Sequence, residues 1–299
     1  MLDTMRTSPR LRLAAMLLPA LLVAAGLFGL GLFEVVRQSL GFGALVPAAS
    51  PGPTLDHYVS LVRDREIHLA LGLTLWVASI STAVSVAIGV GVAVFLRRLQ
   101  RGRRTVHTLL QAPLAVPHLV VALAVITVLA QSGLVARAAF ALGLIDAPAA
   151  FPALINDAAG IGIIVTYALK EVPFLALVAT TLLARVSDEH DAVARTLGAS
   201  SWQRFRYVTW PAIAPGVGAG ALMVFAYVFS AFEAPFLLGR PYPSMLPVVA
   251  QQRFMSLDLA DRPAAMACAF LLTVIAALVV RSYLAVARSV FGRDRPVLF

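Results

Sequence analysis

The sequence predicts an all-α, polytopic membrane protein with six membrane-spanning helices. Of its 299 residues, 60% are hydrophobic and only 13% are charged, and the mean hydropathy is +0.87. A soluble globular domain carries about 25% charged residues, so the composition excludes that class. The apolar residues are also gathered into runs close to the ~20 residues that an α-helix needs to cross a bilayer.

Six apolar runs are the elements of this prediction, and we expect them to form a single transmembrane domain over residues 1–299. The first run is longer than the apolar core of a signal peptide and five more follow it, so we expect an uncleaved span. The runs cover about residues 13–36, 69–96, 106–130, 160–184, 211–238 and 264–286. Close packing against a neighbouring helix is predicted at Gly216, Gly218 and Gly220.

The distribution of arginine indicates the orientation in the membrane. Sixteen arginines fall in the N-terminal segment, the second-to-third connection, the fourth-to-fifth connection and the C-terminal tail, against seven on the other side. By the positive-inside rule, both termini and the connection at 185–210 are predicted to be cytoplasmic. Topology thus explains the net charge of +9, so membrane lipid is an expected partner and nucleic acid is not.

The connection at residues 185–210 has the pattern of two short helices with a corner between them. Acidic residues open the first helix, and Gly198 stands where helices commonly end. The predicted helices run from Asp188 to Leu197 and from Ser200 or Ser201 to Val208. Two interpretations are open: an interfacial connector whose aromatic residues lie against lipid headgroups, or a rigid docking surface for a partner.

Within this connection, the segment Ala194 to Ser200 reads Ala-Arg-Thr-Leu-Gly-Ala-Ser and is followed by Trp202, Phe205 and Trp210-Pro211. The pattern resembles the cytoplasmic signature of inner-membrane permease subunits of binding-protein-dependent ABC importers. That signature runs Glu-Ala-Ala, three residues, Gly, and then a longer gap to Leu-Pro. The resemblance extends from the second apolar run onward, and it implies the fold of a type I ABC importer permease with a cytoplasmic coupling-helix loop.

The signature maps onto this sequence with two departures. The segment Ala192 to Ala194 takes the place of Glu-Ala-Ala, Gly198 that of the glycine, and Trp210-Pro211 that of Leu-Pro. Alanine at position 192 replaces the glutamate, with Asp191 beside it, and tryptophan at position 210 replaces the leucine. The departure at Ala192 leaves open whether Asp191 or Glu189 supplies a salt bridge to the ATPase.

The resemblance also implies a set of partners and a mechanism. The expected partners are an ABC ATPase dimer, a second permease subunit that is identical or a paralogue, and an extracytoplasmic solute-binding protein. No cofactor is expected on this chain, because ATP and Mg²⁺ bind the ATPase, and alternating access would couple hydrolysis to transport. The residues implied in docking the ATPase are Asp191, Ala192, Ala194, Gly198, Ala199, Trp202, Phe205 and Pro211.

Two adjacent charges, Lys170 and Glu171, stand in the middle of the fourth run, where a charge costs about 2.5–3.5 kcal/mol on insertion scales. Adjacent side chains on a helix point in different directions, so these two are not expected to pair with each other. Glu171 shares a face with Tyr167, and Pro173 frees a nearby carbonyl. Two roles are open for these four residues: a structural latch between helices, or a place beside the translocation path.

Another membrane-embedded acid, Glu233, stands near the outer end of the fifth run between Phe232 and Phe236. A carboxylate among aromatic rings suits a cationic solute, and it equally suits a hydrogen bond in a gate. The segments Ala231 to Gly239 and Lys170 to Pro173 resemble the polyamine, ferric iron and thiamine branch of the family. We therefore expect transport of a polyamine or another small cation, with ferric iron, thiamine or a small organic anion as alternatives.

Several enzyme motifs do not occur in the sequence. It contains no Gly-xxxx-Gly-Lys-Ser/Thr phosphate loop, so we expect ATP hydrolysis on a separate partner and no enzymatic activity in this chain. It also contains no His-Glu-xx-His zinc motif and no Gly-x-Ser-x-Gly nucleophile elbow. The alternative class is a membrane enzyme or a channel, with Glu171, Glu233 and His118 as acid–base candidates. Otherwise His118 is expected only to pack within the protein.

Overall fold

The computed structural model describes residues 9–42, 53–99, 101–186 and 188–291. Over these ranges the regular structure is helical and contains no strand, and six segments are long and apolar enough to cross a membrane. The predicted fold class is therefore confirmed. The six candidate spans are Ala15–Ser39, Arg65–Arg98, His118–Ala141, Ile161–Leu183, Ser201–Ser230 and Leu259–Ala287.

The chain divides into two compact units, and the smaller comprises residues 1–63 and 250–271. The Ser39 hydroxyl lies 2.5 Å from the Tyr58 hydroxyl, and the Tyr58 ring meets Phe270 edge-on. Most apolar side chains of the first helix are exposed, as suits a helix facing lipid. The unit contains α1 (Pro9–Ser39), α2 (Asp56–Arg63), η3 (Leu259–Asp261), and parts of α12 (Leu246–Phe254) and α13 (Arg262–Phe291).

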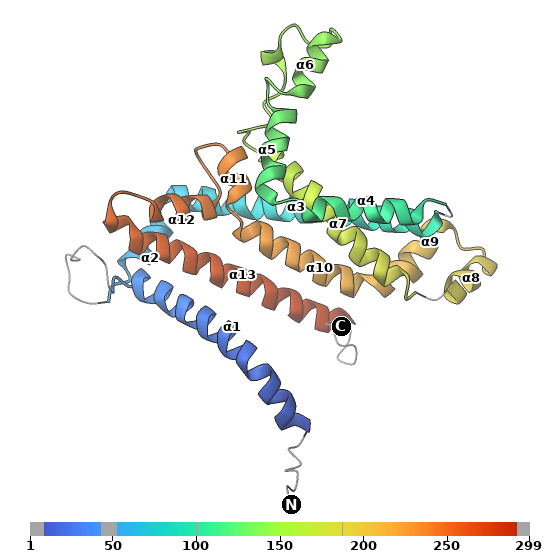
Figure 1. Ribbon diagram of the computed structural model, residues 1–299, viewed down its shortest axis with the longest axis horizontal. Helices are drawn as coiled ribbons and strands as arrows, with labels where there is room; N and C mark the ends of the chain where they lie inside the picture. The colour runs from blue at the N-terminus through green and yellow to red at the C-terminus, as the bar shows by residue number, and fades with distance from the viewer. Residues whose placement is uncertain (1–8, 43–52, 100, 187, 292–299) are drawn as a thin grey trace, which may run out of the picture. The chain divides into compact units, whose positions relative to one another are not determined.

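The larger unit comprises residues 64–249 and 272–299. Three long helices, α3, α7 and α10, pack against one another at its core (Figure 1). Buried side chains from all three meet in one cluster that includes Val90, Ala179 and Ile213. Besides the other parts of α12 and α13, the unit contains α3 (Arg65–Arg98), α4 (Arg103–Ala115), α5 (His118–Leu129), α6 (Leu134–Ala141), η1 (Pro148–Ala150), α7 (Ile161–Leu183), α8 (Asp188–Thr196), α9 (Ser201–Arg204), η2 (Phe205–Thr209), α10 (Trp210–Ser230) and α11 (Glu233–Leu238).

Glycines allow the core helices to approach closely. A Cβ added to Gly89 of α3 would lie 3.0 Å from the backbone nitrogen of Ala176 on α7. On α10, a Cβ at Gly216 would lie 2.6 Å from a methyl of Leu182, and one at Gly220 would lie 3.0 Å from a methyl of Leu175. The close packing predicted for the glycines of the fifth run is therefore confirmed, and α7 is the neighbour of Gly216 and Gly220.

The third apolar run is not the single helix predicted over 106–130. Helix α4 ends at Ala115, and α5 begins at His118 and, with α6, makes up the third candidate span. Pro117 has no backbone N–H, and its ring disfavours helical geometry at the preceding residue, so Val116 is extended with ψ 130°. The break leaves the last carbonyls of α4 without helical donors.

The fifth run also differs from the predicted span over 211–238. It begins at Ser201, because α9, η2 and α10 are continuous, and it ends at Ser230 before the separate helix α11. At the start, the N–H of Trp210 donates to the Phe205 carbonyl, five residues back, and this wider turn makes room for the ring of Pro211. At the end, the Pro235 ring is incompatible with a helical carbonyl at Ala231, which is extended.

Candidate functional site

The corner between the fourth and fifth candidate spans is closed by Gly198. This residue has φ +79°, which favours glycine because it has no Cβ. The N–H of Ala199 donates to the Ala194 carbonyl, and the N–H of Gly198 donates to the Arg195 carbonyl, both at 3.0 Å. These two bonds form a Schellman motif, so α8 ends where the sequence predicts a corner.

The next helix begins immediately after this corner. The Ser200 hydroxyl accepts from the backbone N–H of Gln203, and the Gln203 side chain accepts from the backbone N–H of Ser200 at 2.8 Å. This reciprocal capping box fixes the first turn of α9. Helix α9 then continues without a joint into α10, so the predicted second short helix is the beginning of the fifth span.

An ion pair ties the two sides of the corner together. The Arg204 guanidinium donates to an oxygen of Asp191 at 2.7 Å, and the Arg195 side chain lies 3.8 Å from the same oxygen. Asp191, which the sequence offers as a replacement for the motif glutamate, is thus engaged inside this chain. The role of Arg204 was not predicted from the sequence, because its partner Asp191 lies 13 residues earlier, on the other side of the corner at Gly198.

Two exposed apolar side chains that the signature does not mark lie on α8 and on the residue that follows it. Leu197 is 82% exposed and Val193 is 59% exposed, and their i, i+4 spacing places them on one side of the helix. Ala192 is also exposed, whereas Ala194 and Ala199 are half-buried. An exposed apolar stripe on a short helix is typical of a surface that binds another protein.

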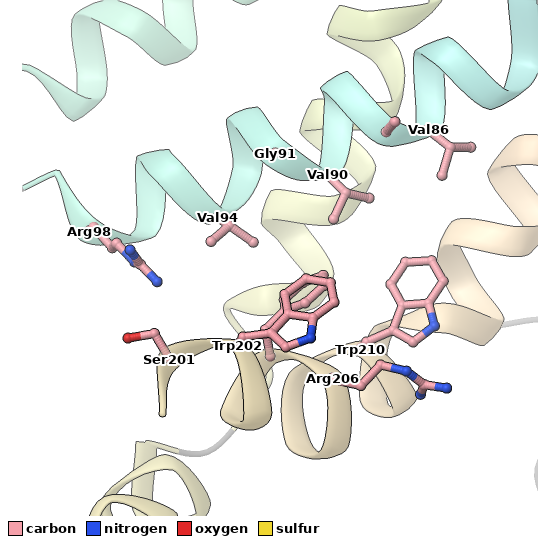
Figure 2. A pocket seen from close by; sticks show the side chains of 11 residues that line it. Val86, Val90, Gly91, Val94, Arg98, Ser201, Trp202, Arg206 and Trp210 are labelled. Carbon is pink, nitrogen blue, oxygen red and sulfur yellow. The ribbon is translucent and has the colours of Figure 1, made fainter. Parts of the chain in front are cut away.

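The beginning of the fifth span carries three aromatic residues whose rings lie next to one another in tilted pairs. The ring centroids of Trp202 and Phe205 are 5.7 Å apart, and those of Phe205 and Trp210 are 6.2 Å apart. Trp202 is 68% exposed, whereas Phe205 and Trp210 pack against the core, and Pro211 is exposed at the start of α10. These aromatics line one side of a groove against α3, which Figure 2 shows.

Lys170 is a buried cap for the broken third run. Its side chain is 4% exposed, and its ammonium donates to the carbonyls of Pro113, Leu114 and Val116 at 2.7, 3.3 and 2.6 Å. These carbonyls lie at the C-terminal end of α4, where the helix dipole also favours a positive charge. Lys170 therefore holds α7 to the α4–α5 junction and has no ion pair with Glu171.

Glu171 meets the histidine at the start of α5. An oxygen of its carboxylate lies 3.3 Å from Nε2 of His118. The His118 ring lies 4.8 Å from that of Tyr227 on α10 and 6.4 Å from that of Tyr167, centroid to centroid. Tyr167 is 1% exposed, and its hydroxyl has no hydrogen-bond partner among the described residues. The structure thus brings residues of α5, α7 and α10 into one polar cluster. Tyr227 was not predicted from the sequence as a member of this cluster.

We expect His118 and Glu171 to be energetically coupled. A double-mutant cycle with His118→Ala and Glu171→Ala should give an interaction energy of about 0.5–3 kcal/mol in unfolding free energy, because contacting residues are not additive. The matched control is His107→Ala combined with Glu171→Ala, since His107 contacts Gln111 on its own helix. Denaturant unfolding in detergent gives both values, and additivity within error for His118 would contradict the contact.

The acid predicted near the outer end of the fifth run lies on the separate helix α11. Glu233 is its first residue, and its side chain is exposed. Phe232 and Phe236 are 36% and 57% exposed on either side of it in the sequence. Helix α11 packs against α5 and α7. The structure does not bring Glu233 and Glu171 into a common hydrogen bond within the described residues, which also contain no cluster of three or more metal-binding side chains.

The six candidate spans and the helical corner between the fourth and fifth are those of a polytopic helical membrane protein. Residues 85–292 match the family of inner-membrane components of binding-protein-dependent transport systems. The chain belongs to this family, which confirms the resemblance seen in the sequence at that level. It is a multi-pass inner-membrane transport subunit and not the ATPase.

Curated relatives and a solved structure agree with this assignment. The inner membrane ABC transporter permease protein YnjC of Escherichia coli is 29% identical over 250 residues, which is 81% of this chain and 47% of YnjC. A probable molybdenum ABC transporter permease protein of Haloferax volcanii is 31% identical over 221 residues, covering 74% of this chain and 75% of the relative. This chain thus spans about half the length of YnjC.

The solved structure is that of a bacterial ABC transporter involved in the import of the acidic polysaccharide alginate. It matches with a TM-score of 0.76 at 20% identity, over 93% of this chain and 95% of the matched chain. At this identity the similarity shows the fold alone. It establishes the architecture of a type I ABC importer permease for this chain.

Proposed function

We propose that this chain forms half of a solute translocation path in an ABC importer, together with a second permease subunit that is identical or a paralogue. A dimer of ATPases, carrying ATP and Mg²⁺, docks on residues 185–210, and an extracytoplasmic solute-binding protein delivers the solute. Both termini lie in the cytoplasm. Alternating access of the path is driven by movement of the docked segment.

The rigidity of the corner at Gly198 carries this proposal. The Schellman motif, the capping box at Ser200 and the ion pair between Asp191 and Arg204 hold α8 against the start of the fifth span. From Ser201 to Ser230 the helix has no non-helical joint. A partner that displaces α8 would therefore tilt α10 directly, which is what coupling of ATP hydrolysis to transport requires.

Replacing Gly198 by valine is expected to uncouple ATP hydrolysis from uptake. A Cβ at this position has no neighbour within 4 Å, so within this chain the substitution acts through the backbone, which a β-branched residue resists at φ +79°. Gly198→Asn is the matched control, because asparagine tolerates this conformation and should keep most of the uptake. In proteoliposomes we expect at least a ~10-fold loss of uptake per ATP, equivalent to about 1.4 kcal/mol, for valine alone. Equal coupling in the two variants would contradict the proposal.

The translocation path is assigned to the exposed side of the larger unit. Glu233 with its neighbours Phe232 and Phe236 faces outward from α11, and the pair of Glu171 and His118 is partly exposed. Tyr167 and Lys170 are buried behind them, so we assign these two residues, with the buried Pro173, to supporting the path and not to contacting solute.

For the solute, a small oxyanion has more support than the polyamine or small cation expected from the sequence. The other membrane-embedded carboxylate, Glu171, is engaged by His118. The Haloferax relative is named for molybdenum, which occurs in neutral water as the oxyanion molybdate. Ferric iron, thiamine and small organic anions are the alternative solutes, and the experiment below compares them.

The test is to reconstitute the permease with its partner subunits and measure ATP hydrolysis after adding the binding protein loaded with molybdate, sulfate, spermidine, ferric iron, thiamine or a small organic anion. Stimulation by molybdate or sulfate alone would support the oxyanion. Stimulation by spermidine alone would return the solute to the polyamine class. Failure to assemble with any ATPase, together with conduction or catalysis by the isolated chain, would replace the importer by a channel or membrane enzyme.

A further inference from the structure

A groove of about 760 Å³ runs along α3 beside the start of the fifth span. We infer that it holds an acyl chain of an anionic phospholipid, whose phosphate is bound by Arg98 and Arg206. One wall of the groove is a stripe of small apolar residues on α3, and the other is built from the aromatic side chains of α9, η2 and α10 (Figure 2). The two arginines are the only charged residues that line it among the described residues.

The dimensions of the α3 wall fit one leaflet of a bilayer. The wall extends from Val86 to Arg98, the last residue of α3. Twelve residues of α-helix rise about 18 Å, and half of a bilayer's ~30 Å hydrocarbon core is about 15 Å. An acyl chain lying along Val86, Val90 and Val94 therefore brings its headgroup to the level of Arg98.

The chemistry of the lining suits hydrocarbon with a phosphate at one end. Apart from the arginines and tryptophan nitrogens, the Ser201 hydroxyl is the one polar side-chain group on the walls, which is too few partners for an extended peptide. Tryptophans line the groove at 202 and 210, and this residue type favours the headgroup region of membranes. Acyl chains are the occupants that need no hydrogen bonds.

The charges of the groove are not neutralised within the described chain. Arg206 lies 5.9 Å from the centroid of the Tyr207 ring, and no acidic side chain pairs with Arg206 or Arg98 among the described residues. The acid on the adjoining cavity, Asp191, is engaged by Arg204. The groove thus ends in two guanidinium groups that have no acidic partner in the part of the chain that the structure describes. Such groups bind an anionic headgroup more strongly than a zwitterionic one.

Gly91 provides a way to fill the groove without disturbing the fold. It lines the groove, and a Cβ added there has no neighbour within 4 Å. Gly91→Leu therefore places a side chain where the acyl chain would lie. Gly72→Leu is the matched control, because Gly72 is on the same helix, is equally open and lies outside the groove.

Tryptophan fluorescence of the full chain in vesicles reports occupancy, since two of the three tryptophans line the groove. The probes are brominated phosphatidylglycerol and brominated phosphatidylcholine at equal mole fraction. We expect stronger quenching by the anionic lipid, and loss of this excess in Gly91→Leu and in Arg98→Gln combined with Arg206→Gln. The excess should remain in Gly72→Leu and in Arg101→Gln combined with Arg104→Gln, which remove two exposed arginines outside the groove.

Equal quenching by the two lipids, or an excess that survives Gly91→Leu, would overturn the proposal. A second measurement uses the assembled transporter, in which native mass spectrometry should find phosphatidylglycerol retained by the wild type and by Gly72→Leu but lost from Gly91→Leu. Absence of retained phosphatidylglycerol from the assembled wild type would also overturn the proposal.

Discussion

Replacing Lys170 by methionine is expected to lower the melting temperature of the permease sharply and to reduce the amount that folds into the membrane. The ammonium makes short hydrogen bonds to the carbonyls of Pro113 and Val116, at 2.7 and 2.6 Å. Methionine keeps most of the length of the side chain but has no donor. The Pro113 carbonyl would still accept from the N–H of Val116 at 3.3 Å, whereas the Val116 carbonyl would lose its Lys170 donor. An acceptor left without a partner costs about 1–3 kcal/mol, so the substitution should cost about 1–3 kcal/mol of unfolding free energy.

The control for this change is Leu169→Met, which introduces the same side chain one position earlier on the same helix. Leu169 is 51% exposed, so little change in stability is expected there. Thermal unfolding in detergent and the yield of protein in the membrane fraction measure both variants. If the two melted at the same temperature, Lys170 would not be a structural cap, and a role beside the translocation path would gain support.

Replacing Gly89 by leucine is expected to separate α3 from α7 and to prevent the larger unit from forming its core. An added Cβ would already lie 3.0 Å from the Ala176 backbone nitrogen and 3.0 Å from the Leu175 Cβ. The backbone of a packed helix cannot move aside as a flexible side chain can, and the rest of the leucine needs still more room. Overpacking of a core costs about 1–3 kcal/mol, and this site should lie at or above the upper end of that range.

Gly91→Ala, two residues further along α3, is the contrasting variant. Its Cβ would have no neighbour within 4 Å, and alanine is the better helix former, so stability should rise by about 0.5–1 kcal/mol. Opposite shifts in melting temperature for the two substitutions would show that packing and not helix propensity makes Gly89 necessary. A Cβ added at Gly89 would lie 3.0 Å from α7. A small or stabilising effect of Gly89→Leu would mean that the two helices are farther apart than this distance implies.

Features set by short stretches of sequence were predictable. The six candidate spans follow from runs of apolar residues, and the corner at Gly198 follows from a glycine at the end of an amphipathic segment. The glycines at the start of α10 likewise predicted close helix packing. In each case, the information lies within one continuous segment of the sequence.

Features that depend on distant partners were not predictable. Pro117 interrupts a helix, whereas α7 continues through Pro173, and the fifth span continues through Pro211. The difference at Pro117 lies in Lys170, which supplies donors to the freed carbonyls from more than 50 residues away. The pairing of Glu171 with His118 has the same origin, because no sequence pattern indicates that α5 and α7 meet at these positions.

The cap formed by Lys170 has a consequence for biosynthesis. The three carbonyls that bind its ammonium precede it by 54 to 57 residues, so the ribosome delivers the acceptors to the membrane before the cation. The lysine side chain can then bind these carbonyls as it enters the bilayer. Without such a partner, inserting a charged residue into the hydrocarbon core costs about 2.5–3.5 kcal/mol. Chain order thus assists insertion, and a circular permutant that translated α7 before α4 would lose that assistance.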